Sequence, residues 1–292
     1  MLAPLIHPLI ESRPFLWMFG SFMKKALIVI FAAMAGTTLG QGEVPQSIDI
    51  HNLPGGANVV EHVVIPVPSE IFSVLDKAGK PRWKEVLRPV SRNLKTPSER
   101  EQIALLLGTV IAEGFVAVEA EEDVEVKNIG NTVIKLAKAL HVEASVTKRA
   151  NAIIDNADKK NWKQVRKELD AAQRDAQEAM HAMQDDDLSQ LVSLGGWLRG
   201  LEALTAVVKA DFKKETADLL HQPSLLDYFD KRLAAMPKKM QDKPLVAKMR
   251  KGLGEIRPLM GTEGSDISEK TVGDVNAIAE DLVKGITVKT NP

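Results

Sequence analysis

Cysteine is absent from all 292 residues of the chain. This excludes disulfide bonds, thiolate metal sites, a cysteine nucleophile and covalently attached c-type haem. It also excludes the lipid anchor of a bacterial lipoprotein, because a cysteine carries that lipid. Aromatic residues make up only 4% of the chain and are not interleaved with basic residues, as they are in proteins that stack on bases. Since the net charge is −1, we expect no binding to nucleic acid.

The familiar signatures of enzymes are missing as well. The sequence has no Gly-x-Ser-x-Gly elbow, no His-Glu-x-x-His zinc motif, no phosphate-binding Walker loop and no dinucleotide fingerprint. The run Asp185-Asp186-Asp187 lacks the alternating ligands and the glycine of a calcium loop. These absences favour a non-catalytic role.

The N-terminal residues have the pattern of a secretory signal peptide. Met23-Lys24-Lys25 precedes an apolar run from Ala26 to Ala35, which is too short to cross a bilayer as a helix. We predict that translation starts at Met23, after 22 upstream residues, and that cleavage follows Gly40. The alternative is an uncleaved anchor over residues 16–35, but Lys24 and Lys25 interrupt it. We therefore predict a periplasmic or secreted protein that is not an integral membrane protein after cleavage.

Apolar residues recur in alternating steps of three and four through most of the chain beyond residue 96. The clearest series is Trp162, Val165, Leu169, Ala172, Ala176, Ala179 and Met183. This spacing marks one face of an α-helix and predicts the shallow crossings of a helical bundle. We therefore predict an all-α fold, with an antiparallel bundle over residues 96–211 and a smaller helical region over residues 212–292. Asp185-Asp186-Asp187 is expected to mark the turn between two long helices, with one continuous bent helix as the alternative.

Residues 41–95 are predicted to form an N-terminal arm. Two segments with a period of two, residues 48–51 and 58–65, flank Pro54-Gly55-Gly56 and predict a small hairpin or an extended arm. One or two short helices are expected to follow, beginning near Ser69 and near Pro81.

Two segments of the predicted bundle are apolar on nearly every side. Residues 103–118 contain only Glu113 as a charge, and residues 188–208 contain only Arg199 and Glu202. Helices of this composition belong in the centre of a fold. Both segments also carry glycines that would let two backbones approach closely, at positions 108, 114, 195, 196 and 200. We predict that the two helices are neighbours.

Glu113, Arg199 and Glu202 are therefore candidate buried charges. A buried charge must be paired or neutralised. The first interpretation is a structural ion pair between Glu113 and Arg199 that fixes the register of the two helices. The second is a ligand-binding cluster that lines a pocket left open by the glycines, where a carboxylate of raised pKa acts as an acid or a ligand.

Glu178 and His181 form the sharpest pattern that points to a metal. A glutamate and a histidine three residues apart lie on one side of a helix, and di-iron bundles use this pair twice, together with two further glutamates. Here the pair occurs once, and Glu113 is the one candidate for a facing carboxylate. A solvated helix face is the simpler interpretation. Copper or haem bound in the bundle is the weaker alternative, and no cofactor is predicted.

A basic run lies in the C-terminal region. Between residues 231 and 257 there are nine basic residues and two acidic ones. The candidate partner-binding face consists of Lys238, Lys239, Lys248, Arg250 and Lys251. Such a face attracts an anionic surface, although a solvated helix face, paired in part with the acids of residues 119–125, is the usual outcome.

Together these features predict an exported, non-catalytic helical protein that binds or scaffolds in the cell envelope. Its expected partner is an envelope protein or an anionic surface component. The alternative is a periplasmic helical bundle that holds a metal, haem or small molecule in its core. The sequence does not indicate the oligomeric state.

Overall fold

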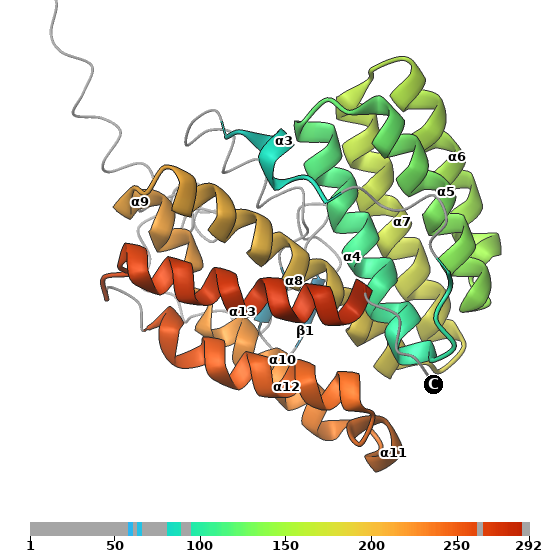
Figure 1. Cartoon of the computed structure of the whole chain (residues 1–292). Helices are drawn as coiled ribbons and strands as arrows, with labels where there is room; N and C mark the ends of the chain where they lie inside the picture. The colour runs from blue at the N-terminus through green and yellow to red at the C-terminus, as the bar shows by residue number, and fades with distance from the viewer. Residues whose placement is uncertain (1–57, 61–62, 66–80, 89–94, 262–264, 288–292) are drawn as a thin grey trace, which may run out of the picture. The chain divides into compact units, whose positions relative to one another are not determined.

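A computed structural model describes residues 58–60, 63–65, 81–88, 95–261 and 265–287 (Figure 1). The predicted signal peptide, the upstream residues, the cleavage site and the predicted helix near Ser69 lie outside the described residues. The described part is all-α apart from one short two-stranded ladder, which confirms the predicted fold class.

The ladder pairs β1 (Asn58–Val60) with β2 (Val63–Ile65) in antiparallel register, with Asn58 opposite Ile65. Both strands belong to the single extended segment predicted over residues 58–65. The two halves of this segment pair with each other, whereas residues 48–51 and Pro54-Gly55-Gly56 lie outside the described residues, so the pairing across them stays a prediction. The signal for the pairing of the two halves is the apolar pair at each end of the segment, Val59-Val60 and Val63-Val64.

Five consecutive helices form the antiparallel bundle (Figure 1). They are α4 (Arg100–Glu119), α5 (Asp123–Ala139), α6 (Glu143–Asp158), α7 (Trp162–Ala182) and α8 (Asp186–Ala210). Each of α5, α6 and α7 packs against the helices before and after it, and α4 also contacts α7 and α8. The break before Asp186 confirms the predicted turn between two long helices.

The four connections in this bundle share one turn geometry. Each has a residue with positive φ just after the helix, namely Glu121, His141, Lys160 and Gln184, with φ between 52° and 63°. The next residue donates its backbone N–H to a carbonyl five residues earlier, as Asp185 does to Met180 over 2.8 Å. This is the Schellman ending, which satisfies the last carbonyls of a helix. Met183, predicted in the core, lies at such an end and is 41% exposed, because α7 stops at Ala182.

The two apolar helices α4 and α8 are neighbours in the core, as predicted. Both are long and apolar enough to cross a membrane, but 94% and 89% of their apolar windows are buried within this fold. A Cβ on Gly108 would lie 1.9 Å from the Val192 carbonyl oxygen, and one on Gly195 would lie 2.0 Å from that of Leu105. Glycine is therefore required at both positions. Gly114 instead faces Leu169 of α7.

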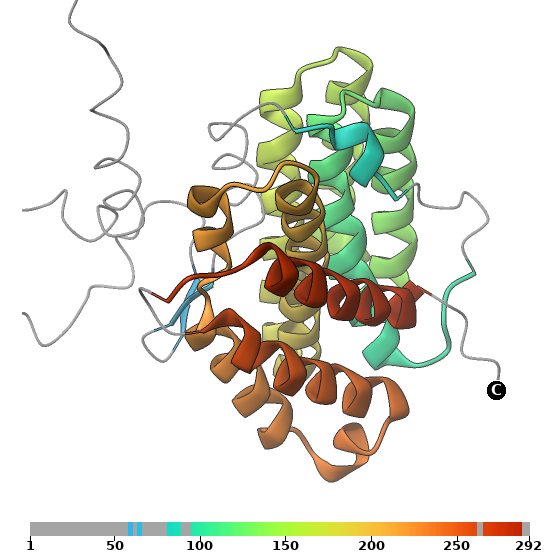
Figure 2. The ribbon, with the colours of Figure 1, turned by 60° about the vertical axis from the view of Figure 1, so that its left-hand side comes forward.

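The remaining helices pack onto this core. They are α3 (Trp83–Val86), α9 (Lys214–Ala217), η2 (Asp218–Leu220), α10 (Pro223–Ala235), α11 (Lys238–Gln241), α12 (Pro244–Ile256), η3 (Arg257–Met260) and α13 (Glu269–Thr287). Helix α13 lies against α8 and α12 and also contacts α4 (Figure 2). Its buried face, which includes Val272, Val275, Ala279 and Leu282, belongs to the same hydrophobic core as the bundle.

Candidate functional site

Glu113, Arg199 and Glu202 meet in the core, although Glu113 is far from the other two in sequence. Their side chains are only 1–3% exposed. The Arg199 Nε donates to Glu113 Oε2 over 2.5 Å, which confirms the predicted pair. Arg199 Nη1 lies 3.3 Å from Glu202 Oε2, one turn along α8. The close α4–α8 approach at the glycines brings these charges into contact.

A fourth charge, Arg88, completes what we call the ionic cluster: Arg88, Glu113, Arg199 and Glu202. The backbone N–H of Arg88 donates to Glu113 Oε1 over 2.6 Å. Its guanidinium donates to Glu202 Oε1 through Nε and Nη2, over 3.1 and 2.9 Å. Sequence reasoning missed Arg88. The available signal was charge balance, because two buried carboxylates and one arginine leave a negative charge that needs a second cation.

The cluster also binds the backbone of the segment before α4. Arg199 Nη2 donates to the Val86 carbonyl oxygen over 2.8 Å. On the other side, Asn276 of α13 donates to the Glu202 carbonyl oxygen and to Thr205 Oγ1, over 3.3 and 3.0 Å. Residues from α3, α4, α8 and α13 therefore meet around one polar centre in an otherwise apolar core.

The environment of Glu113 opposes its ionisation. Burial raises its pKa to about 7, against the lowering effects of the Arg199 charge and hydrogen bond and of the Arg88 N–H, while Glu202 adds a smaller raising effect. Three of the four carboxylate oxygens in the cluster accept hydrogen bonds from the chain. Two buried polar atoms of the cluster make no hydrogen bond, namely Glu202 Oε2 and Arg199 Nη1. They lie 3.3 Å apart as an ion pair, without the geometry of a hydrogen bond.

At three of the five glycines the packing leaves no space for the expected pocket beside this cluster. Its space was predicted from the glycines, but the backbone of the partner helix fills it at Gly108 and Gly195, and the Leu169 side chain fills it at Gly114. A glycine in a helix can serve either for close approach or for a cavity, and here it serves for close approach. Whether Glu113, Arg199 and Glu202 bind a ligand stays a prediction.

Glu178 and His181 both lie exposed on α7. The His181 Nδ1 lies 2.5 Å from Asp186 Oδ1, and the hydrogen bond and charge of Asp186 raise the pKa of His181. The described residues contain no group of three or more histidine, aspartate or glutamate side chains that could hold a metal ion. Within the described residues, the fold therefore brings no set of further metal ligands to Glu178 and His181. Glu113, the expected facing carboxylate, lies in the buried ionic cluster instead.

Most of the predicted basic face is paired with acids of its own region. Lys238 contacts Asp242 at 2.7 Å, Arg250 contacts Asp230 at 2.8 Å, Lys248 contacts Asp281 at 3.0 Å and Lys251 contacts Glu255 at 3.6 Å. Lys239 is exposed.

Contrary to the expectation, the acids that bind Lys238, Lys248, Arg250 and Lys251 lie outside residues 119–125. In the described part, Glu119 binds Arg166 of α7 and Glu122 binds Lys84. The basic run instead lies beside α10 and α13, whose exposed aspartates are nearer. Partners on another helix depend on packing, which charge patterning along the chain does not reveal.

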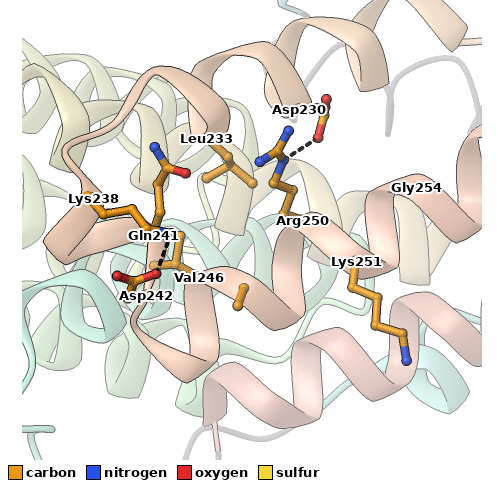
Figure 3. A pocket seen from close by; sticks show the side chains of 10 residues that line it. Asp230, Leu233, Lys238, Gln241, Asp242, Val246, Arg250, Lys251 and Gly254 are labelled. Carbon is orange, nitrogen blue, oxygen red and sulfur yellow. Dashed lines mark hydrogen bonds and ion pairs between the residues drawn. The ribbon is translucent and has the colours of Figure 1, made fainter.

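A groove of about 480 Å³ opens between α10, α11 and α12 (Figure 3). Its lining includes three members of the basic face, Lys238, Arg250 and Lys251. The acids Asp230 and Asp242, the amide of Gln241, and the apolar residues Leu233, Val246, Ala247 and Gly254 complete it. The Arg250–Asp230 ion pair spans from α12 to α10 (Figure 3).

Comparison with protein families, with curated proteins and with solved structures gives no match, so no activity is carried over from a relative.

Proposed function

We propose that this protein is an exported, non-catalytic binding protein of the cell envelope, and that the groove between α10, α11 and α12 receives an acidic segment of an envelope protein. The observation that carries this proposal is the lining of the groove, where exposed cations stand around an apolar floor. Export rests on the signal-peptide pattern that ends at Gly40.

The charges of the groove favour an anionic occupant. Three cations and two acids line it, which leaves one positive charge in excess. The side chains of Lys238 and Lys251 are 79% and 80% exposed. Ion pairs this exposed contribute little to stability, so a carboxylate of a partner can replace the internal acid at small cost.

The floor of the groove adds an apolar contact. Leu233 and Val246 are packed into the core and are only 2% and 1% exposed. The small part of each that remains accessible lines the groove together with Ala247. Gly254 carries no side chain and would have open space around a Cβ. An apolar side chain of the partner can therefore settle between the charged rims. This matches the usual anatomy of an interface, with an apolar centre and a polar edge.

The test uses the full chain and a fluorescent peptide in which glutamate and leucine alternate. We expect binding that weakens as salt is added, because the contacts are partly ionic. The triple variant Lys238→Glu, Arg250→Glu, Lys251→Glu is expected to lose at least tenfold in affinity. A matched control changes three exposed lysines elsewhere, Lys213→Glu, Lys214→Glu and Lys270→Glu, and is expected to bind nearly as well as the wild type.

Equal losses in the two triple variants would mean that the peptide responds only to net charge, and the groove proposal would fall. No measurable binding by the wild type at low salt would also refute it. Circular dichroism of each variant confirms that the fold is kept.

A further inference from the structure

The segment Trp83–Arg88, which we call the strap, contacts the core as a bound peptide contacts its receptor. Trp83 is an apolar anchor, only 5% exposed, and α3 lies beside both α4 and α8. Five residues later, Arg88 is the charged tip, with a side chain 52% exposed. An aromatic residue in an apolar site together with an arginine on a carboxylate is a typical pair of anchors in peptide recognition.

The surface under the strap is complete without it. Glu113 and Glu202 flank Arg199 through contacts that involve only α4 and α8. The close contacts at Gly108 and Gly195 are likewise made between these two helices. The strap is therefore not required to bring α4 and α8 together.

Above the raised pKa of Glu113 this surface carries one negative charge in excess, because two ionised carboxylates then face one guanidinium. Arg88 supplies the missing positive charge by contacting Glu202 at 2.9 Å and Glu280 of α13 at 3.3 Å. Hydrogen bonds between ionised partners are among the strongest in proteins, and a guanidinium suits carboxylates especially well.

Backbone recognition adds a second element. The Arg88 backbone N–H donates to Glu113 Oε1, and the Val86 carbonyl oxygen accepts from Arg199. Buried side chains of the core therefore form hydrogen bonds with the backbone of the strap. These two bonds fix the direction and the depth of the segment and leave the arginine to provide charge.

We propose that Glu113, Arg199, Glu202 and Glu280 form a docking seat for a segment with an aromatic anchor and an arginine five residues later. In this chain the strap fills the seat. The seat is a binding site for a guanidinium-bearing peptide, and its natural occupant is covalently attached. Its role is to hold the residues before α4 on the bundle independently of the packing of the bundle itself.

Hydrogen exchange of the full chain tests this separability. In Arg88→Ala we expect the amides of residues 83–88 to exchange at least tenfold faster, while α4 and α8 keep their protection. The control is Arg100→Ala, because Arg100 is similarly exposed, at 46%, and also binds an acid, Asp185, at 2.7 Å. The control is expected to leave the strap unchanged.

A second variant and an added ligand make the test independent of any damage to the fold. Glu280→Gln alters a side chain that is 56% exposed, and is expected to speed exchange of the strap about two- to threefold. Millimolar methylguanidinium added to Arg88→Ala is expected to restore protection of the strap, because it can occupy the seat beside Glu202.

Three results would overturn the proposal. The first is unchanged exchange of the strap in Arg88→Ala. The second is faster exchange of both the strap and α4 in Arg88→Ala, because the strap would then unfold together with the core and would not be a separable segment. The third is methylguanidinium that leaves Arg88→Ala unchanged, or that acts equally on Arg100→Ala, because the seat would then not recognise a guanidinium.

Discussion

Replacing Glu113 with glutamine should remove a pH dependence from the stability of the fold. In the folded protein burial raises the pKa of Glu113 to about 7, from an ordinary value of 4.5. Between these two values the folded protein holds a proton that the unfolded chain releases. The contribution of Glu113 to stability is therefore fully present below pH 4.5 and is lost as the pH rises through 7.

The size of the effect follows from the displacement of the pKa. Each unit corresponds to about 1.4 kcal/mol, so the free energy of unfolding should fall by roughly 3 kcal/mol across this range because of Glu113 alone. Glutamine has nearly the same shape as glutamate, does not titrate, and can still accept the Arg88 N–H through its carbonyl oxygen. Groups elsewhere titrate in both proteins, so their effects cancel in the difference between wild type and Glu113→Gln.

The assay is urea unfolding of both proteins, followed by circular dichroism at several pH values from about 4.5 to 8. We expect the stability of the wild type to decline relative to Glu113→Gln by roughly 3 kcal/mol as the pH rises. The opposite trend, with the wild type gaining on the variant, would refute the reasoning. It would show that the Arg199 contact and the Arg88 N–H outweigh burial and hold the pKa of Glu113 below its ordinary value.

Three further predictions concern the stability of the helical bundle. Gly108→Ala is expected to lower the free energy of unfolding by about 3 kcal/mol or more in urea titration, because its Cβ would overlap the Val192 carbonyl oxygen. The control Gly254→Ala, which has open space around its Cβ, should be neutral or slightly stabilising. Lys160→Gly is expected to stabilise by up to about 1 kcal/mol, measurable as a higher Tm, because Lys160 has a φ of 52° that glycine adopts without strain. Arg199→Met is expected to cost about 3–5 kcal/mol in urea titration near pH 8, and less near pH 5, where Glu113 holds a proton. A cost of Arg199→Met that does not vary with pH would contradict the proposed coupling.

The sequence predicted the helices well because their signals are local. The spacing of apolar residues in α7 and the scarcity of charges in residues 103–118 and 188–208 indicated which residues are buried. Composition also identified α4 and α8 as neighbours, since helices that are apolar on every side need cover and their glycines permit a close approach. Met183 was misplaced because the end of α7 depends on the turn at Gln184, where a residue other than glycine adopts positive φ.

The candidate site was less predictable, because it joins segments that are distant in the chain. The contact between Glu113 and Arg199 could be predicted, because Glu113 is the one charge of residues 103–118 and Arg199 is the one cation of residues 188–208. The role of Arg88 could not, because nothing in its local pattern distinguishes it from other surface arginines. The same holds for the acids that pair with the basic face, which come from α10 and α13 as well as from the face itself.

The glycine contacts and the ionic cluster select the same register for α4 and α8. Two apolar helices can slide past each other with little change in buried area, so hydrophobicity alone specifies their register weakly. A shift of one turn, about 5.4 Å, would place a side chain where Gly108 now meets the backbone of α8. The same shift would separate the buried Glu113 carboxylate from Arg199, the cation with which it pairs. Steric and electrostatic penalties therefore fall on the same alternatives, which gives an almost featureless apolar interface a single arrangement.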